Sequence, residues 1–246
     1  MNRGAVAVGF DRDELGSLLL DGAALLDLEV DPSQVGALLG YVEHLLRWNR
    51  TYNLTAVREP RAVVSHHLLD CLAVVPALRR KRASPGRHRI LDVGSGAGLP
   101  GLVLAVMEPG SEVTCVDSVG KKAAFIAQAA AALRLANVRA VHARIEDIRQ
   151  DNYDVITARA FASLSSLVRA TERLLNEGGV WMAMKGRRPD QEVEELAGAV
   201  DVEIEPLSVP HLASERCLVW MQRTTSAGEC TLASKPAWQL AKEKNR

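Results

Sequence analysis

Apolar residues in the first part of the chain recur at the three- to four-residue spacing of amphipathic helices. Leucines follow this spacing within 11–28. A second apolar stripe covers 35–48 and comes after Asp31-Pro32, a dipeptide typical of a helix start. A third helix is expected over 61–78. Residues 1–78 are therefore predicted to form an N-terminal helical segment.

From about residue 89 the pattern changes to short apolar strands that alternate with helices. The expected strands are 89–93, 112–117, 138–142, 153–157, 179–184, 202–208 and 216–222. The expected helices are 99–107, 120–135, 144–149, 163–176 and 189–199. This alternation is typical of βαβ units and a parallel sheet, whereas the last two strands lack a long connecting helix and should pair antiparallel. The sequence predicts an α/β, Rossmann-like core over 79–223, with a mostly parallel seven-stranded sheet and a terminal antiparallel strand.

Two segments lie outside these elements. Residues 79–89 are rich in Arg and Lys around Ser84-Pro85-Gly86, and we interpret them as the linker into the core. Residues 224–246 are polar and basic and are expected to form a disordered tail.

Composition narrows the possible partners and locations. Lys plus Arg equals Asp plus Glu at 30 each, so a nucleic-acid partner would have to be met by a local basic patch. The four cysteines form no CxxC pair, which argues against a zinc site and a disulfide framework, and no metal is expected. The chain shows no signal-peptide pattern and no apolar run of roughly 18 residues, so we expect no membrane segment and a cytoplasmic protein.

A glycine-rich loop follows the strand 89–93. It contains Gly94, Gly96 and Gly98, and a helix is expected from about Leu99. Glycines allow a sharp turn and a close approach of a ligand, and a helix N-terminus adds N–H groups and a positive partial charge. The loop predicts a site for a nucleoside cofactor with an anionic group. Because Gly96, Gly98 and Gly101 also fit the GxGxxG pattern, the loop alone does not distinguish a dinucleotide from other nucleoside cofactors.

Acidic residues follow the next two strands. Asp117 ends the second strand, 21 residues after Gly96, where a carboxylate in this class of fold faces the ribose of a nucleoside. Its alternative role is to cap the next helix. Ile145 and Glu146 follow the third strand and suit the face and the amino group of an adenine. Their alternative is a solvated helix start in which the acid favours the helix dipole.

An ordered set of segments carries a family resemblance. The segments are Trp48-Asn49, Asn53-Leu54-Thr55, His67, Leu69-Asp70, Asp92 through Gly101, Asp117-Ser118, Gly120-Lys121, Arg144, Glu146, Arg159-Ala160-Phe161-Ala162, Lys185-Gly186 and Glu215-Arg216. With this set, the chain from about 31 to 222 resembles the small-subunit ribosomal RNA methyltransferase G family, also called the glucose-inhibited division protein B family. Residues 1–30 and the tail from 224 lie outside the resemblance.

The resemblance implies a class I methyltransferase that uses S-adenosyl-L-methionine. Its implied substrate is N7 of a single guanine (guanine 527 in the usual rRNA numbering) in 16S rRNA, presented as RNA or within the 30S subunit. By position, the implied cofactor contacts are Gly94, Leu99, Ile145, Glu146 and Arg159, with Asp117 at the ribose. His66 stands where many relatives carry Arg or Lys, a difference that would lower the positive charge of its helix at neutral pH, and Cys71 stands where they carry serine.

Methyl transfer to guanine N7 makes modest chemical demands. N7 carries a lone pair and no proton, so the enzyme needs no general base and acts mainly by positioning. Arg159, just past the fourth strand, is expected to hold the cofactor, or the guanine through O6 or a phosphate. Its alternative is a surface ion pair.

Candidate RNA contacts are basic residues at several points of the chain. They are Arg79, Arg80, Lys121, Lys122, Lys185, Arg187, Arg188 and Arg216. Taken singly each is more often a solvated surface residue, but together at the carboxyl edge of the sheet they would form an RNA surface with salt-dependent binding.

Other residues and other functions have competing interpretations. Trp48 and His67 are interpreted as core residues, and Asn49 and Asn53 as backbone caps. Competing functions are a nicotinamide-dependent oxidoreductase, which shares the glycine loop, and a non-catalytic RNA-binding protein on the same fold. A monomer is expected.

Overall fold

The computed structural model describes residues 10–81, 87–149 and 152–224. Its strands are β1 (Arg89–Val93), β2 (Glu112–Asp117), β3 (Val138–His142), β4 (Tyr153–Arg159), β5 (Leu175–Lys185), β6 (Val200–Leu207) and β7 (Arg216–Arg223). They form one sheet in the order β3-β2-β1-β4-β5-β7-β6. Strand β7 is antiparallel to both β5 and β6, whereas β1 to β5 pair in parallel. This arrangement confirms the predicted mostly parallel, seven-stranded Rossmann-like sheet.

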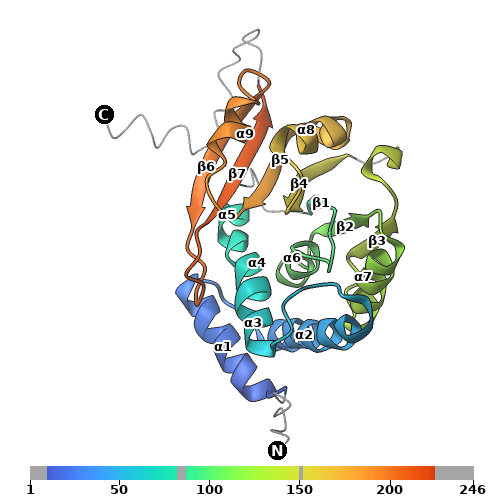
Figure 1. Cartoon of the computed structure of the whole chain (residues 1–246), viewed down its shortest axis with the longest axis vertical. Helices are drawn as coiled ribbons and strands as arrows, with labels where there is room; N and C mark the ends of the chain where they lie inside the picture. The colour runs from blue at the N-terminus through green and yellow to red at the C-terminus, as the bar shows by residue number, and fades with distance from the viewer. Residues whose placement is uncertain (1–9, 82–86, 150–151, 225–246) are drawn as a thin grey trace, which may run out of the picture.

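Helices cover both faces of the sheet (Figure 1). The N-terminal helices α1 (Arg12–Leu25) and α2 (Pro32–Tyr52) lie on the same side as α6 (Gly101–Met107) and α7 (Gly120–Ala132), and all four contribute to one apolar cluster. A second cluster on the other face includes α8 (Leu164–Thr171), the 3-10 turns η2 (Ile145–Asp147) and η3 (Glu172–Leu174), and residues next to α9 (Asp190–Glu194). The N-terminal helices thus share a core with the α/β sheet.

The start of α2 follows the sequence signal closely. The Asp31 carboxylate accepts hydrogen bonds from the Ser33 and Gln34 N–H groups, while the Gln34 side chain accepts one from the Asp31 N–H. This reciprocal capping box satisfies N–H groups that a helix start leaves without partners. The predicted helix start at Asp31-Pro32 is confirmed.

A long helical stretch runs from Pro60 to Lys81. Its parts are α3 (Pro60–Val63), the π-helical η1 (Val64–Leu69), α4 (Asp70–Leu72) and α5 (Val74–Lys81). By length and composition this stretch could cross a membrane, but 67% of its apolar window is buried inside the molecule, as in a core helix of a globular protein. The predicted end at residue 78 was three residues early. The basic last turn interacts favourably with the helix dipole, so residues 79–81 belong to the helix and not to the linker.

Several other predicted boundaries were wrong, among them the end of the helix expected over 120–135, which lies at Ala132. Strand β5 begins at Leu175, where a helix over 163–176 was expected, because Leu175 pairs with Tyr153 ahead of a register shift. The glycine at 178, with φ of +72°, sits within this irregular stretch. The helices expected over 144–149 and 189–199 shorten to η2 and α9. The predicted tail 224–246 lies, from residue 225, outside the described residues.

Candidate functional site

The glycine loop turns sharply at the carboxyl end of β1. Gly94, Gly96 and Gly98 all have φ between +60° and +77°, a region that side chains disfavour. The N–H groups of Gly94 and Ser95 donate to the Val116 carbonyl, and that of Gly98 donates to Ser95. Most N–H groups of the loop therefore donate to acceptors within the protein. Room for a ligand comes mainly from Gly94 and Gly96, where the backbone is not fully buried.

Gly98 and Leu99 shape the loop from beneath. A Cβ on Gly98 would lie 2.5 Å from Leu102 Cδ1. Leu99 is buried in the apolar cluster under the loop, so it offers a ligand its backbone and not its side chain. Both residues support the glycine turn within the core.

Two buried carboxylates tie the loop to the sheet. Asp92, fully buried, accepts a hydrogen bond of 3.0 Å from the Gly101 N–H at the start of α6, and burial raises its pKa to about 6. Asp117 accepts hydrogen bonds from the N–H groups of Gly96 (2.9 Å) and Val119 (2.8 Å). Asp117 thus binds the loop and turns the chain toward α7, whose N-cap Val119 receives no side-chain cap.

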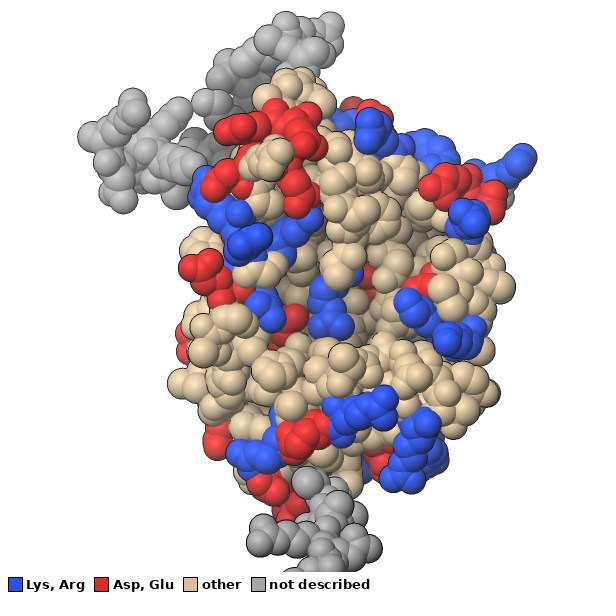
Figure 2. Space-filling model, viewed as in Figure 1, with Lys and Arg blue, Asp and Glu red and all other residues tan. Residues whose placement is uncertain are grey.

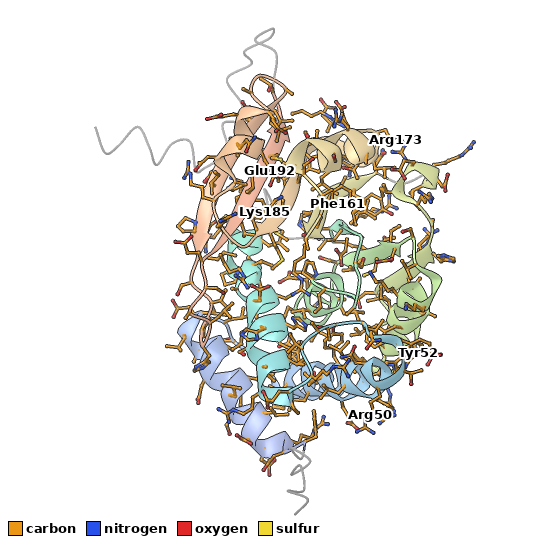
Figure 3. The ribbon with its side chains drawn as sticks, in the orientation of Figure 1. Arg50, Tyr52, Phe161, Arg173, Lys185 and Glu192 are labelled. Carbon is orange, nitrogen blue, oxygen red and sulfur yellow. The ribbon has the colours of Figure 1, made fainter. Side chains whose placement is uncertain are left out.

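The turn η2 carries Ile145 and Glu146 at the carboxyl end of β3. The Ile145 side chain is buried and that of Glu146 is exposed. Arg173, in the turn η3 that follows α8, donates to the carbonyls of Ile145 (2.8 Å), Glu146 (3.1 Å) and Ile148 (2.7 Å). One exposed guanidinium from a different element therefore fixes the backbone of this turn. Figure 3 shows Arg173 at the outer end of this region.

The segment after β4 brings two side chains to the glycine loop. Arg159 ends β4, and Ala160 has φ of +62°, which is uncommon for a residue with a side chain and reverses the chain. Phe161 then lies over the loop, where a Cβ on Gly94 would be 3.9 Å from its ring (Figure 3). Because parallel strands end at one edge, the loop, Asp117, η2 and Arg159 share the carboxyl edge of β1 to β4.

Arg159 is part of an ion-pair cluster that the sequence did not predict. Its Nη1 lies 3.4 Å from Asp70 Oδ2, and Arg216 Nε donates to Asp70 Oδ1 at 2.8 Å. Asp70 is only 4% exposed, and it belongs to the long helix 60–81 immediately after its π-helical segment. The alternative of a surface ion pair for Arg159 therefore does not describe this partly buried pairing.

The neighbours of this cluster are neutral. His67 Nδ1 donates to the His66 carbonyl (3.0 Å), so its Nε2 accepts from the Thr55 hydroxyl (2.8 Å); burial and the nearby Arg159 cation lower the pKa of His67. Burial raises the pKa of the Cys71 thiol to about 12, which leaves it protonated and unsuited as a nucleophile. The hydrogen bonding expected of His67 is confirmed, although its side chain is only partly buried.

The polar segment after α2 is structural. Asn49 is buried and exchanges two hydrogen bonds with the Thr55 backbone, and Asn53 ends α2 in the left-handed conformation. Trp48 packs edge-on against Phe125 in the core. The capping interpretation of Asn49 is confirmed. Asn53 stands at the helix C-cap, but its side chain accepts from Arg58 and not from the backbone, and Trp48 packs against the core while staying partly exposed.

The predicted basic residues fall into two groups. Four residues of the first group pair with acids. Lys122 lies 4.0 Å from Asp117, and Lys185 donates to both Glu192 carboxylate oxygens at 2.8 Å. Arg188 pairs with Asp190, and Arg216 with Asp70. Lys121 and Arg187, next to these residues in the chain, are exposed. These six lie at the starts of α7, α9 and β7 and the end of β5, on the side of the sheet edge that carries the site.

Arg79 and Arg80 have different surroundings. Arg79 donates to Glu108 and to the Met107 carbonyl, at the end of α6 remote from the glycine loop, and Arg80 pairs with Glu205 of β6. Figure 2 shows a hollow in the middle of the face, with basic side chains inside it and along its rim. Figure 3 places Lys185 and Glu192 side by side near this hollow.

The sheet order, the antiparallel β7, the glycine loop after β1 and the acidic residue that ends β2 together define a class I methyltransferase. A tRNA (m1A58) methyltransferase from Aquifex aeolicus has a similar fold, with a TM-score of 0.51, 14% identity, and coverage of 63% of this chain and 69% of that one. Residues 34–219 match the family model described as rRNA small subunit methyltransferase G.

Curated relatives extend this likeness over most of the chain. Ribosomal RNA small subunit methyltransferase G from Leptothrix cholodnii is 51% identical over 213 residues, which cover 86% of this chain and 95% of the relative. The protein of that name from Methylibium petroleiphilum is 50% identical, with coverage of 87% and 97%. The chain belongs to the rRNA small subunit methyltransferase G family, and it is an enzyme of the methyltransferase class.

Proposed function

We propose that this enzyme transfers a methyl group from S-adenosyl-L-methionine to N7 of one guanine in 16S rRNA, at the position numbered guanine 527. The observation that carries the proposal is the meeting of the open glycine loop, Phe161 and the anchored Arg159 at one sheet edge. Family membership supports the same reaction class.

The cofactor would be held by residues at the ends of three strands. Gly94 and Gly96 leave room over the backbone, and Gly98 and Leu99 form the floor beneath it. Asp117 has further lone pairs on its carboxylate for ribose hydroxyls, and Ile145 and Glu146 would flank the adenine. S-adenosyl-L-methionine supplies an electrophilic methyl group on a sulfonium centre.

The residues around the reacting atoms act by positioning and by excluding other chemistry. Guanine N7 presents a lone pair, so no proton has to be removed, and the neutral His67 and the protonated Cys71 are not needed as base or nucleophile. Arg159 would hold the guanine through O6 or a phosphate, because a contact with N7 itself would block the nucleophile. Phe161 offers an aromatic face to a base above Gly94.

The RNA surface would consist of the basic residues around the hollow. Lys121, Lys122, Lys185, Arg187, Arg188 and Arg216 lie on the appropriate side, whereas Arg79 and Arg80 are paired at other places and would contribute less. Several phosphate contacts would make binding fall steeply as salt rises. The substrate would be 16S rRNA or the 30S subunit, met by a monomer in the cytoplasm.

The experiment is transfer of labelled methyl to 16S rRNA and to small subunits from cells that lack this enzyme, with the modified base mapped. We expect label at a single guanine N7, and at least tenfold less with Asp117→Ala. Asp201→Ala, an exposed acid in β6, is the matched control and should behave as wild type. Label at another base or on another atom would contradict the proposal. The assignment of the cofactor would be wrong if a nicotinamide dinucleotide raised the melting temperature of the protein and S-adenosylmethionine did not.

A further inference from the structure

A single buried carboxylate holds two guanidinium groups that come from distant parts of the chain. Asp70 lies in the long helix 60–81, Arg159 ends β4 and Arg216 begins β7. The sequence separations from Asp70 are 89 and 146 residues. The cluster therefore joins the helical segment to both halves of the sheet at its carboxyl edge.

The two guanidinium groups keep donors to spare. Arg216 Nη1 donates to Ser214 Oγ (3.0 Å) and to the Glu215 carbonyl (2.7 Å), and Nε donates to Asp70. Within the described part of the chain, Arg216 Nη2 and the Nε and Nη2 atoms of Arg159 donate to no protein acceptor. The side chains are 23% and 24% exposed, so both are partly accessible to solvent.

One carboxylate makes the hydrogen bonds to both guanidinium groups of the cluster. His67, Cys71 and Tyr41 beside it are neutral at pH 7, because burial lowers the pKa of the histidine and raises the pKa values of the thiol and the phenol. Asp92 accepts from the Gly101 N–H and hydrogen-bonds neither guanidinium, although its charge interacts with Arg159. Lys185 is paired with Glu192. Among the described residues Asp70 is thus the acid that hydrogen-bonds both groups, and partly buried guanidinium groups with donors left over favour an anionic ligand.

The position of Arg216 indicates which anion. Two strands, β4 and β5, separate β7 from β1 in the sheet. At roughly 4.8 Å per strand, the start of β7 lies about 14 Å from the glycine loop along the sheet edge. Arg216 is therefore displaced along the sheet edge, away from the loop that is proposed to hold the cofactor. The planar guanidinium fork matches the oxygens of a phosphate in bidentate geometry.

We propose that Arg159 and Arg216 form a seat for one RNA phosphodiester group, and that Asp70 is the positioning residue that holds both guanidinium groups in place. The proposal rests on the proposed function, because it identifies how the acceptor RNA is held at that site. Asp70 touches neither substrate nor cofactor; it fixes the distance between the two groups that grip the phosphate. The seat would orient the target nucleotide with its N7 toward the cofactor.

The test compares wild type with Arg216→Gln and Arg216→Lys in methylation of unmethylated small subunits. We expect Arg216→Gln to raise KM for subunits by roughly tenfold to hundredfold, since hydrogen bonds to charged groups have about this weight. It should also reduce the slope of log KM against log salt by about one, as for the loss of one phosphate contact. Arg216→Lys keeps the charge but lacks the planar guanidinium fork. It should have the wild-type salt slope, and a KM between those of wild type and Arg216→Gln.

A second arm identifies the anion through the affinity for S-adenosylmethionine, measured by calorimetry, and through inhibition by small ligands. Guanosine 5'-monophosphate should inhibit wild type at lower concentration than guanosine, and this difference should vanish in Arg216→Gln with the cofactor affinity unchanged. If instead Arg216→Gln weakens the cofactor and leaves inhibition alone, the anion is the cofactor carboxylate and the proposal is overturned.

Controls separate the seat from folding and from the proposed function. Arg61→Gln removes an arginine from an exposed pair with Glu14 and should match wild type in every assay. Melting temperatures show whether Arg216→Gln is folded. Wild-type KM and salt slope in a folded Arg216→Gln would overturn the seat while methylation at N7 stands. Failure of wild type to methylate subunits would instead remove the proposed function itself.

Discussion

The two halves of the site are built in different ways. On the proposed cofactor side, residues 92–117 are held mainly by contacts between near neighbours in sequence: Asp92 binds Gly101 nine residues on, and Gly96 binds Asp117 at a separation of 21. One distant contact is added there by the Tyr41 hydroxyl, which donates to the Ala97 carbonyl across 56 residues. On the proposed substrate side, Asp70 reaches Arg159 and Arg216 across 89 and 146 residues. The first half depends mainly on local backbone geometry, and the second on the assembly of the entire sheet.

The largest effect is expected from the long-range half. Asp70→Asn removes the charge that two partly buried guanidinium groups share, and breaking such a pair costs about 3 to 5 kcal/mol of unfolding free energy. Urea unfolding measures this loss. Asp190→Asn, which removes the acid of the exposed pair with Arg188, should change stability little. If both substitutions lowered the unfolding free energy by the same small amount, the long-range half would not depend on the Asp70 cluster as described.

The glycine turn tests the local half. In Gly98→Ala a side chain would be placed at φ of +77°, at a cost of about 1 to 2 kcal/mol, and 2.5 Å from Leu102, at a further cost of about 1 to 3 kcal/mol. We expect a lower melting temperature and weaker cofactor binding. The matched control is Gly36→Ala in α2, where a Cβ meets nothing within 4 Å and should stabilise the helix.

The buried Asp92 gives the local half a pH signature. Its pKa is about 6 in the folded protein against an ordinary 3.8, so between these values the unfolded chain loses the proton first. The unfolded state then binds fewer protons, and stability falls by about 2 to 3 kcal/mol as pH rises from about 4 to about 6. The difference in unfolding free energy between wild type and Asp92→Asn should follow this curve. A difference that is constant with pH would contradict it.

The smallest effect concerns a single side chain, Arg173, that joins η3 to η2. Arg173→Ala releases three carbonyls of the turn that carries Ile145 and Glu146. We expect the affinity for S-adenosylmethionine to fall roughly threefold to tenfold, while kcat at saturating cofactor is unchanged. Arg169→Ala, an exposed arginine on α8, is the control. A loss of kcat with unchanged cofactor affinity would show that Arg173 acts elsewhere.

The same division explains what could be predicted from the sequence. Strands β1 to β3 were predicted with their observed bounds. Strands β1 and β2 are short apolar runs that end before a glycine or at an acid, whereas β3 mixes apolar and polar residues. Strand β5 and the long helix 60–81 were misjudged at their ends, since a register shift and an ion-paired last turn depend on partners elsewhere.

The site residues divide in the same way, into those that a local sequence pattern marks and those whose partners are remote in sequence. The turn of the glycine loop was evident from its glycines, although its N–H groups bind the protein more than expected. The roles of Asp70 and Arg173 were missed because no local pattern marks a residue whose partners are remote. Phe161 belonged to the matching segments, but only the left-handed Ala160 shows that it turns back over Gly94.

The place of β7 in the sheet has a consequence for folding during synthesis. Strand β7 is the last of the described strands along the chain, yet it lies between β5 and β6 and begins with Arg216. Strands β5 and β6 therefore cannot be joined, and Asp70 cannot gain its second guanidinium, until residues 216–223 have been synthesised. The Asp70 cluster of this rRNA methyltransferase family member is thus completed only after the strands that carry the glycine loop and Arg159 have been made.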